Sequence, residues 1–337
     1  MRVNLGQNSY DILIGTGLLG KAGEILDLNR RVLIVTDDGV PEVYAETVAK
    51  QCASSFIHVI RQGEESKSLA VFESLQKKML EHDFHREDCV LALGGGVVGD
   101  LAGFAASAYM RGIDFYNIPT TVLSQVDSSI GGKTAVNFMG VKNILGAFYQ
   151  PKKVVIDFDV LRSLPKRQFG NGIVEAFKMA ATFDEALFQK FLAAEGEEVF
   201  PLISSAIDIK RKVVEEDEKE AGLRKVLNFG HTLGHGIEVA SSGKLLHGES
   251  VALGMLPMCD PSVAAQILAM MKKYDLPVVD FDRDLAMQAI MHDKKGKKDS
   301  VTVVYVPYLG TYEFRELSYP ELKTLLKRIP AIVSGQY

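Results

Sequence analysis

The chain has 337 residues, of which 47% are hydrophobic and 24% are charged. This length favours two domains over one small core, and the composition is that of an ordinary globular protein. The formal net charge of -5 argues against a nucleic-acid scaffold, although a local cationic pocket for a small anion is compatible with it.

The cysteines and the apolar segments exclude further classes. Cys52, Cys89 and Cys259 are widely spaced and odd in number, so we expect neither a disulfide framework nor a thiolate zinc site. No apolar run reaches the roughly 18 residues that a membrane helix needs. The first residues lack the pattern of a signal peptide. We therefore expect a cytoplasmic protein that binds neither nucleic acid nor membrane.

The first half of the chain alternates predicted strands and helices. Apolar runs predict strands, and stretches of helical periodicity follow them. The strands are expected at residues 10–15, 31–36, 56–60, 89–93 and 115–118, and the helices at residues 42–52, 67–82 and 101–110. This repeated alternation predicts an α/β fold with a parallel, Rossmann-like sheet.

The pattern changes after about residue 157. Helical periodicity dominates residues 172–290, and residues 301–314 are typical of a β-hairpin. The charged run 210–225 predicts a solvated helix face. We place the domain boundary between residues 155 and 165, which gives an α/β domain over 1–160 and a mainly helical domain over 161–337.

A glycine-rich turn follows the strand predicted at residues 89–93. Gly94, Gly96 and Gly99 match G-x-G-x-x-G between a strand and a helix, where backbone N–H groups can approach a pyrophosphate. The acidic residue usual about 20 positions later is not cleanly present, because Asp114 precedes the next strand. Phosphate binding is favoured over a plain tight turn. Asp37 is equally consistent with a ribose ligand and with a loop aspartate.

A dense polar segment runs from residue 127 to residue 137 and is followed by Lys142 and Asn143. We find little helical or strand pattern in it and expect a long loop. Such loops on an α/β scaffold usually serve a site. A surface connection is the alternative, but the glycines beside Lys133 favour a site.

Three histidines and one glutamate suggest a metal site. If residues 224–238 are helical, Asn228, His231 and His235 share one narrow stripe, and His247 follows nearby. The interleaved glycines each cost about 1 kcal/mol in a helix, so they indicate close approach to the backbone. Residues 171–178 place Glu175 on a helix, and one carboxylate with two imidazoles is a common catalytic zinc set. The alternatives are two ordinary helix histidines with one loop histidine, and a solvent-exposed Glu–Lys pair.

Taken in order, these motifs resemble the 3-dehydroquinate synthase family along almost the whole chain. The resemblance rests on the glycine-rich turn and on residues 109–112, 119–121, 126–134, 174–178, 222–224, 227–235 and 246–249. It implies a Rossmann-like NAD domain, a helical domain, and zinc or cobalt in a cleft. It also implies conversion of 3-deoxy-D-arabino-heptulosonate 7-phosphate to 3-dehydroquinate and phosphate, by transient oxidation, phosphate elimination, re-reduction and aldol closure. We expect a homodimer.

The resemblance also implies residue roles. The metal ligands are Glu175, His231 and His247. The catalytic groups are His235 and Glu220, which transfer protons, with Lys133, Arg224 and Asn228. The substrate pocket comprises Arg111, Asp127, Lys133, Lys142, Asn143, Asn171, Lys178, Lys210, Arg224, Asn228 and either Lys294 or Lys295. The NAD site comprises Asp37, Glu64, Lys67, Gly94, Gly95, Gly96, Gly99, Asp100, Thr120, Thr121, Lys133, Lys142 and Ser163.

The departures from the family pattern are small, because Phe177 and Val141 replace common residue types without removing a reacting group.

Two other functions are alternatives. An NAD- and metal-dependent polyol dehydrogenase would not need the cations Arg111, Lys133, Lys178, Lys210 and Arg224, which suit a ligand with a carboxylate and a phosphate. A non-catalytic regulator would not need His235 and Glu220 beside an intact ligand set.

Overall fold

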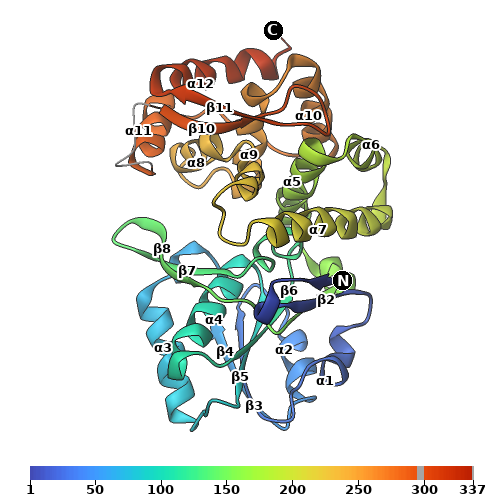
Figure 1. The fold of residues 1–337 in the computed structure, drawn as a ribbon, viewed down its shortest axis with the longest axis vertical. Helices are drawn as coiled ribbons and strands as arrows, with labels where there is room; N and C mark the ends of the chain where they lie inside the picture. Colours follow the sequence, from blue (N-terminus) through green and yellow to red (C-terminus); the bar gives the residue numbers. More distant parts are fainter. Residues whose placement is uncertain (294–299, 336–337) are drawn as a thin grey trace. The chain divides into compact units, whose positions relative to one another are not determined.

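The computed structural model describes residues 1–293 and 300–335. The chain forms two compact units (Figure 1). Unit 1 comprises Met1–Pro165 and Lys210–Lys219, and unit 2 comprises Lys166–Ile209 and Glu220–Tyr337. The chain therefore leaves unit 1 near residue 165 and returns to it at the end of helix α7 (Val199–Glu216).

Unit 1 is built on a seven-stranded sheet within the described residues. The strand order is β1-β2-β9-β6-β5-β3-β4, and all neighbours are parallel except the short β1 beside β2. The strands are β1 (Arg2–Val3), β2 (Tyr10–Gly15), β3 (Arg31–Asp37), β4 (Ser54–Ile60), β5 (Cys89–Gly94), β6 (Asp114–Pro119) and β9 (Lys153–Asp157). The predicted α/β class with a parallel sheet is confirmed.

Both faces of this sheet are covered, because alternate residues of the central strands enter two different cores. On one face Leu33 and Val90 pack with α3 (Leu69–Glu81) and α4 (Gly96–Ala108). On the other, Ile34 and Leu91 pack with residues of α1 (Ala22–Ile25) and α2 (Glu42–Ala49). Continuous apolar runs in β3 and β5 follow from this double burial.

The strand order reverses direction between β3 and β5. The chain proceeds outward from β3 to β4 and then crosses to β5 on the other side of β3. Open parallel sheets bind ligands beyond the carboxyl ends of the strands at such a reversal. Asp37 ends β3 and Gly94 ends β5, so both residues lie at this edge.

The polar segment after residue 127 was expected to be a long loop, and that expectation was wrong, because most of the segment forms regular secondary structure. Residues Ser124–Ser128 form a π-helical turn, and β7 (Lys133–Phe138) pairs with β8 (Val141–Phe148) as an antiparallel hairpin. Thr134 and Val136 are buried while their neighbours are not, so a period of two was present among the polar residues. Met139 and Gly140 turn the chain with positive φ angles of 50° and 78°, as two-residue hairpins require.

Unit 2 is mainly helical, and Figure 1 shows its small hairpin between α12 and α8. Besides the first part of α7, its helices are α5 (Lys166–Phe183), α6 (Glu185–Ala193), α8 (His231–Ala240), α9 (His247–Met255), α10 (Pro261–Lys273), α11 (Arg283–Asp293) and α12 (Tyr319–Val333). The expected hairpin is present as β10 (Ser300–Tyr305) and β11 (Glu313–Ser318), so its second strand runs beyond residue 314. No described helix is long and apolar enough to cross a membrane.

Candidate metal centre and nucleotide-binding edge

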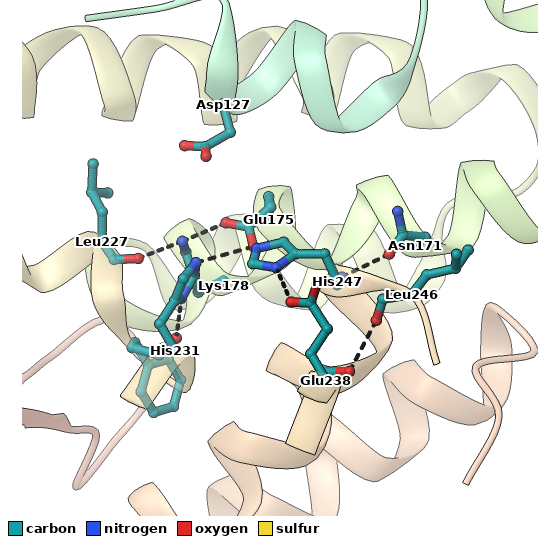
Figure 2. Close-up of polar contacts among 12 residues, drawn as sticks. Asp127, Asn171, Glu175, Lys178, Leu227, His231, Glu238, Leu246 and His247 are labelled. Carbon is teal, nitrogen blue, oxygen red and sulfur yellow. Dashed lines mark hydrogen bonds and ion pairs between the residues drawn. The ribbon is translucent and has the colours of Figure 1, made fainter. Parts of the chain in front are cut away.

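Four side chains of unit 2 converge from three helices. Glu175 lies on α5, His231 and His235 lie on α8, and His247 begins α9. Oε1 of Glu175 lies 3.7 Å from Nε2 of His231 and 3.9 Å from Nε2 of His247. Figure 2 shows the two imidazoles beside this carboxylate. Helices distant in sequence therefore bring together the three predicted metal ligands.

The Glu175 carboxylate is fully buried, with 0% of its surface exposed. Neither of its oxygens accepts a hydrogen bond from the residues that the structure describes, although the Lys178 ammonium forms an ion pair with Oε2. A buried carboxylate with unused acceptor capacity is costly unless it is paired or holds a cation. The donor set of one carboxylate and two imidazoles fits zinc or cobalt.

The imidazoles of the two expected ligands have different surroundings. Burial, the charge of Lys178 and the neighbouring imidazoles lower the pKa of His231 well below its usual range, which favours the neutral ring that a metal needs. Burial would also lower the pKa of His247, but its hydrogen bond to Glu238 and the charge of Glu175 outweigh burial and raise that pKa.

His235 is also near the centre, at a ring-centroid distance of 5.4 Å from His231 and 5.7 Å from His247. Ligand nitrogens of all three histidines lie within 4.8 Å of one another, so distance alone does not separate ligand from proton carrier. His235 is the exposed member of the three, and Glu175 is the buried group with unused acceptors. Burial, unlike distance, distinguishes His235 from Glu175, and the roles expected for them stay predictions.

The prediction that Asn228, His231 and His235 share one helix face was wrong, because the backbone breaks between Asn228 and His231. Residues Leu223–Asn228 form a 3-10 helix, and Gly230 then takes a left-handed φ of 78° before α8 begins at His231. Only glycine adopts that conformation readily. Asn228 therefore lies outside the helix of His231, and its amide donates to Glu220 at 2.7 Å. Glu220 itself has a φ of 60°.

The glycines of this region allow helices to touch. A Cβ at Gly234 would come within 3.2 Å of backbone atoms of Ser250 and Val251, and one at Gly254 would overlap the backbone of Gly230. α8 and α9 therefore pack backbone to backbone. The close approach expected at Gly230, Gly234 and Gly236 is confirmed. The partner of Gly230 and Gly234 is α9, which carries His247, whereas the partner of Gly236 is α11.

Asn171 and Lys178 lie on α5, and Arg224 lies on the 3-10 helix Leu223–Asn228. Lys178 and Arg224 are each 2% exposed, and Asn171 is buried. The Lys178 ammonium donates to the carbonyl of Leu227. Asn171 Oδ1 accepts from the N–H of Gly248, next to His247. Phe177, the departure from the family pattern, packs edge-on against Phe188 at 6.1 Å.

The glycine-rich turn of unit 1 opens α4. A Cβ at Gly94 would come within 2.6 Å of Val98, so this glycine lets the helix pack close to the strand. α4 begins at Gly96, earlier than expected, and no side chain caps it at Gly95. Its first N–H groups are thus available to an anion, which helix N-termini favour. Asp114 starts β6, at the opposite strand end, and pairs with Arg30 at 2.8 Å.

A charged network lies beside this turn. Lys67 is buried and pairs with Asp100 at 2.6 Å and with Glu64 at 3.9 Å. Burial raises the pKa of Asp100 to about 6, against the attraction of Lys67. Asn137 on the hairpin donates to Glu64 at 2.8 Å. The structure thus brings together three residues expected in the NAD site.

Other expected residues of unit 1 have different partners. Asp37 Oδ1 accepts from the N–H of Gly39 at 2.9 Å, and burial raises its pKa. Thr120 donates its N–H to the Gly94 carbonyl at 2.9 Å. Asp127 forms an ion pair with Lys210 of α7. The residues Thr121, Arg111, Lys133, Lys142, Asn143 and Ser163 are partly or fully exposed. Lys294 and Lys295 lie outside the described residues.

Sequence reasoning assigned no role to Glu238, which contacts His247 directly at 3.0 Å. A signal was available, because Glu238 follows His231 by seven positions and His235 by three on α8. Such residues share one face of a helix.

Comparison with known proteins identifies the family of the chain. The family models described as 3-dehydroquinate synthase N-terminal and C-terminal match residues 57–171 and 172–296. The chain is 40% identical to the 3-dehydroquinate synthases of Streptococcus sanguinis and Enterococcus faecalis, with 97% of this chain and at least 98% of each relative covered.

Solved structures of related cyclases have the same fold. A 2-epi-5-epi-valiolone synthase from Streptomyces hygroscopicus subsp. jinggangensis, with NAD+ and Zn2+ bound, is 27% identical with a TM-score of 0.88, covering 97% of this chain and 98% of that one. A 2-deoxy-scyllo-inosose synthase, complexed with carbaglucose-6-phosphate, NAD+ and Co2+, is 25% identical with a TM-score of 0.87, covering 97% and 99%. The length and identity of these matches show that the chain belongs to the 3-dehydroquinate synthase family.

Proposed function

We propose that this protein converts 3-deoxy-D-arabino-heptulosonate 7-phosphate to 3-dehydroquinate and phosphate, as an NAD- and metal-dependent lyase of the shikimate pathway. Membership of the family supports this reaction. The observation that carries it is the buried Glu175 carboxylate within 4 Å of two imidazoles, because a dedicated cation site is what the chemistry requires.

Unit 1 is proposed to hold NAD and unit 2 the metal. When bound, the metal would supply a Lewis acid for a substrate hydroxyl and NAD would supply a reversible hydride acceptor, so that redox would balance within one turnover. The uncapped start of α4 offers N–H groups to the pyrophosphate. Lys67, Asp100 and Glu64 form a fixed polar cluster beside it.

Glu175, His231 and His247 are proposed as the three metal ligands. The Nδ1 atom of His231 lies 3.2 Å from the backbone oxygen of Phe229. The Nδ1 atom of His247 lies 3.0 Å from Oε2 of Glu238. The Nε2 atom of each ring is the one that faces Glu175. A three-ligand set leaves coordination positions for substrate, as in catalytic sites.

His235 and Glu220 are proposed to move protons. His235 is exposed, so its ring can exchange a proton with substrate or solvent, and histidine titrates near neutral pH. Glu220 accepts from Asn228 at 2.7 Å, which holds the carboxylate in one orientation. Its left-handed backbone conformation is of the kind often found at functional positions.

The cations are proposed to bind a doubly anionic substrate. Arg224 and Lys178 are buried in unit 2, where Lys178 also pairs with Glu175, and arginine can grip a carboxylate or phosphate with two parallel hydrogen bonds. In unit 1, Lys133 and Lys142 are exposed on the β7–β8 hairpin. An alcohol without charge would not need this set.

One assay tests the function. Purified protein with the metal restored is given the heptulosonate phosphate and a trace of NAD, and released phosphate and NADH absorbance are followed together. We expect many phosphates per NAD and no accumulation of NADH. Stoichiometric NADH would indicate a polyol dehydrogenase instead, and faster turnover of neutral sedoheptulose 7-phosphate would indicate a different member of the cyclase group.

The proposals of a homodimer and of a cytoplasmic location come from the sequence reading and the family resemblance. Light scattering after size exclusion tests the first, since a dimer has twice the 37.0 kDa of the chain. Cell fractionation tests the second.

A further inference from the structure

A carboxylate behind the metal centre contacts one of the expected ligands. Glu238 Oε2 lies 3.0 Å from Nδ1 of His247, on the side of the ring away from Nε2, which faces Glu175. Figure 2 shows the ring of His247 between the two carboxylates. The bond joins α8 to α9, the two helices that carry the histidines.

The helix geometry explains how Glu238 reaches this place. Residues seven apart on a helix lie almost directly above one another, so Glu238 follows His231 on the face that α8 presents to the centre. The close glycine contact between α8 and α9 holds the His247 ring within reach. Glu238 is half-buried, with 21% of its side chain exposed, so water competes only partly for the carboxylate.

The bond fixes which nitrogen of His247 can bind a metal. An ionised carboxylate has no hydrogen to donate, so Nδ1 must carry the proton and Nε2 presents its lone pair. His231 differs, because its Nδ1 faces a backbone carbonyl, an uncharged acceptor. A carboxylate behind the ring makes the imidazole a better electron donor than a carbonyl does.

We propose that Glu238 is a positioning residue that orients His247 and strengthens its bond to the divalent metal. This inference rests on the proposed function, since it assumes that Glu175, His231 and His247 hold the metal. Glu238 does not touch the reacting atoms in this role. Its effect reaches the reaction through the affinity of the site and the orientation of one ligand.

The test compares Co2+ binding to metal-free full-length protein. The variants are Glu238→Ala, which removes the acceptor, and Glu238→Gln, which keeps an acceptor oxygen but removes the charge. Affinity is measured by competition with a chromophoric chelator, and the ligand field is followed in the Co2+ absorption spectrum. We expect roughly 10–100-fold weaker binding for Glu238→Ala, the usual effect of losing such a partner, and a smaller loss for Glu238→Gln.

The matched control is Asp280→Asn, which also removes one negative charge from unit 2 but at an exposed carboxylate paired with Arg283. It should bind Co2+ with the affinity of the unaltered protein. At saturating Co2+ the Glu238→Gln variant should recover most of its turnover, because excess metal compensates for the weaker affinity of the site and the amide oxygen still accepts from His247.

Failure of this inference and failure of the proposed function give different results. If the unaltered protein binds Co2+ and both Glu238 variants bind it equally tightly with an unchanged spectrum, this inference is wrong while the proposed function stands. If the unaltered protein binds no divalent metal, the proposed function fails first. Equal weakening in Asp280→Asn would show a general charge effect and would also overturn the assignment.

Discussion

Asn171 Oδ1 accepts a hydrogen bond of 2.7 Å from the backbone N–H of Gly248, so the side chain of α5 holds the first turn of α9. Asn171 lies one helical turn before Glu175, and Gly248 directly follows His247. One contact therefore sets the spacing between the helix of one expected ligand and the helix of another. Asn171 was expected in the substrate pocket, and its oxygen has this structural partner.

Gly248→Ala tests this packing. A Cβ there would overlap the backbone oxygen of Asn171, so α5 and α9 must separate. We expect a loss of about 1–3 kcal/mol in the free energy of unfolding, the usual cost of overpacking, together with weaker metal binding. Denaturant unfolding measures the first effect. Gly20→Ala is the control, because nothing lies within 4 Å of that added Cβ; equal stability of the two variants would contradict this account.

Removal of the metal should abolish turnover. Chelation followed by dialysis should leave an inactive protein, and zinc or cobalt should restore it, because Glu175, His231 and His247 offer one compact donor set. His231→Ala should lose most of its bound metal, as measured by elemental analysis. Full activity in protein shown to be metal-free would refute the requirement.

His235→Ala should keep its metal and lose turnover. Three other side chains form the proposed ligand set, and His235 is the exposed histidine of the three. We expect a fall in kcat of roughly 10²–10⁴-fold, the range for a general acid–base group, with near-stoichiometric metal. The measurement pairs steady-state kinetics with metal analysis on one sample. Loss of metal in this variant would make His235 a ligand.

Arg224→Lys should impair substrate use without affecting NAD. The guanidinium is 2% exposed, and lysine cannot reproduce its two parallel hydrogen bonds to a carboxylate. Lysine keeps the positive charge but loses one of these hydrogen bonds, and a hydrogen bond to a charged group contributes about 1.5–3 kcal/mol. kcat/KM for the heptulosonate phosphate should therefore fall strongly, while the affinity for NAD, measured by calorimetry, should not. An unchanged kcat/KM would place the carboxylate elsewhere.

Asp100 should make stability depend on pH. Burial raises its pKa from 3.8 to about 6, so the folded protein holds this proton more tightly than the unfolded chain. The resulting stability is complete below pH 3.8 and is lost as the pH rises through 6. The shift corresponds to about 3 kcal/mol. From pH 5 to pH 7.5, unaltered protein should lose more stability than Asp100→Asn, as urea unfolding would show; parallel pH profiles would exclude this titration.

The amino-acid sequence by itself determined the fold class and the identity of the chemical groups. Continuous apolar runs such as residues 31–36 predict doubly buried strands, because side chains on both faces must avoid water. The spacing of His231 and His235, together with Glu175 and His247, indicated a metal site, because imidazoles and carboxylates are common metal ligands. The hairpin of β7 and β8 was missed because its alternation is carried by Thr134 and Val136 among polar residues.

Only the tertiary structure decided how these groups are used. Gly230 ends the continuity of the helix with its left-handed φ, and so removes Asn228 from the histidine stripe. The burial of Glu175 and the exposure of His235 depend on helices far apart in sequence. The contact of Glu238 with His247 requires α8 and α9 to touch at their glycines. Spacing along a chain specifies which side chains share one helix face, whereas distances between helices depend on packing among all of them.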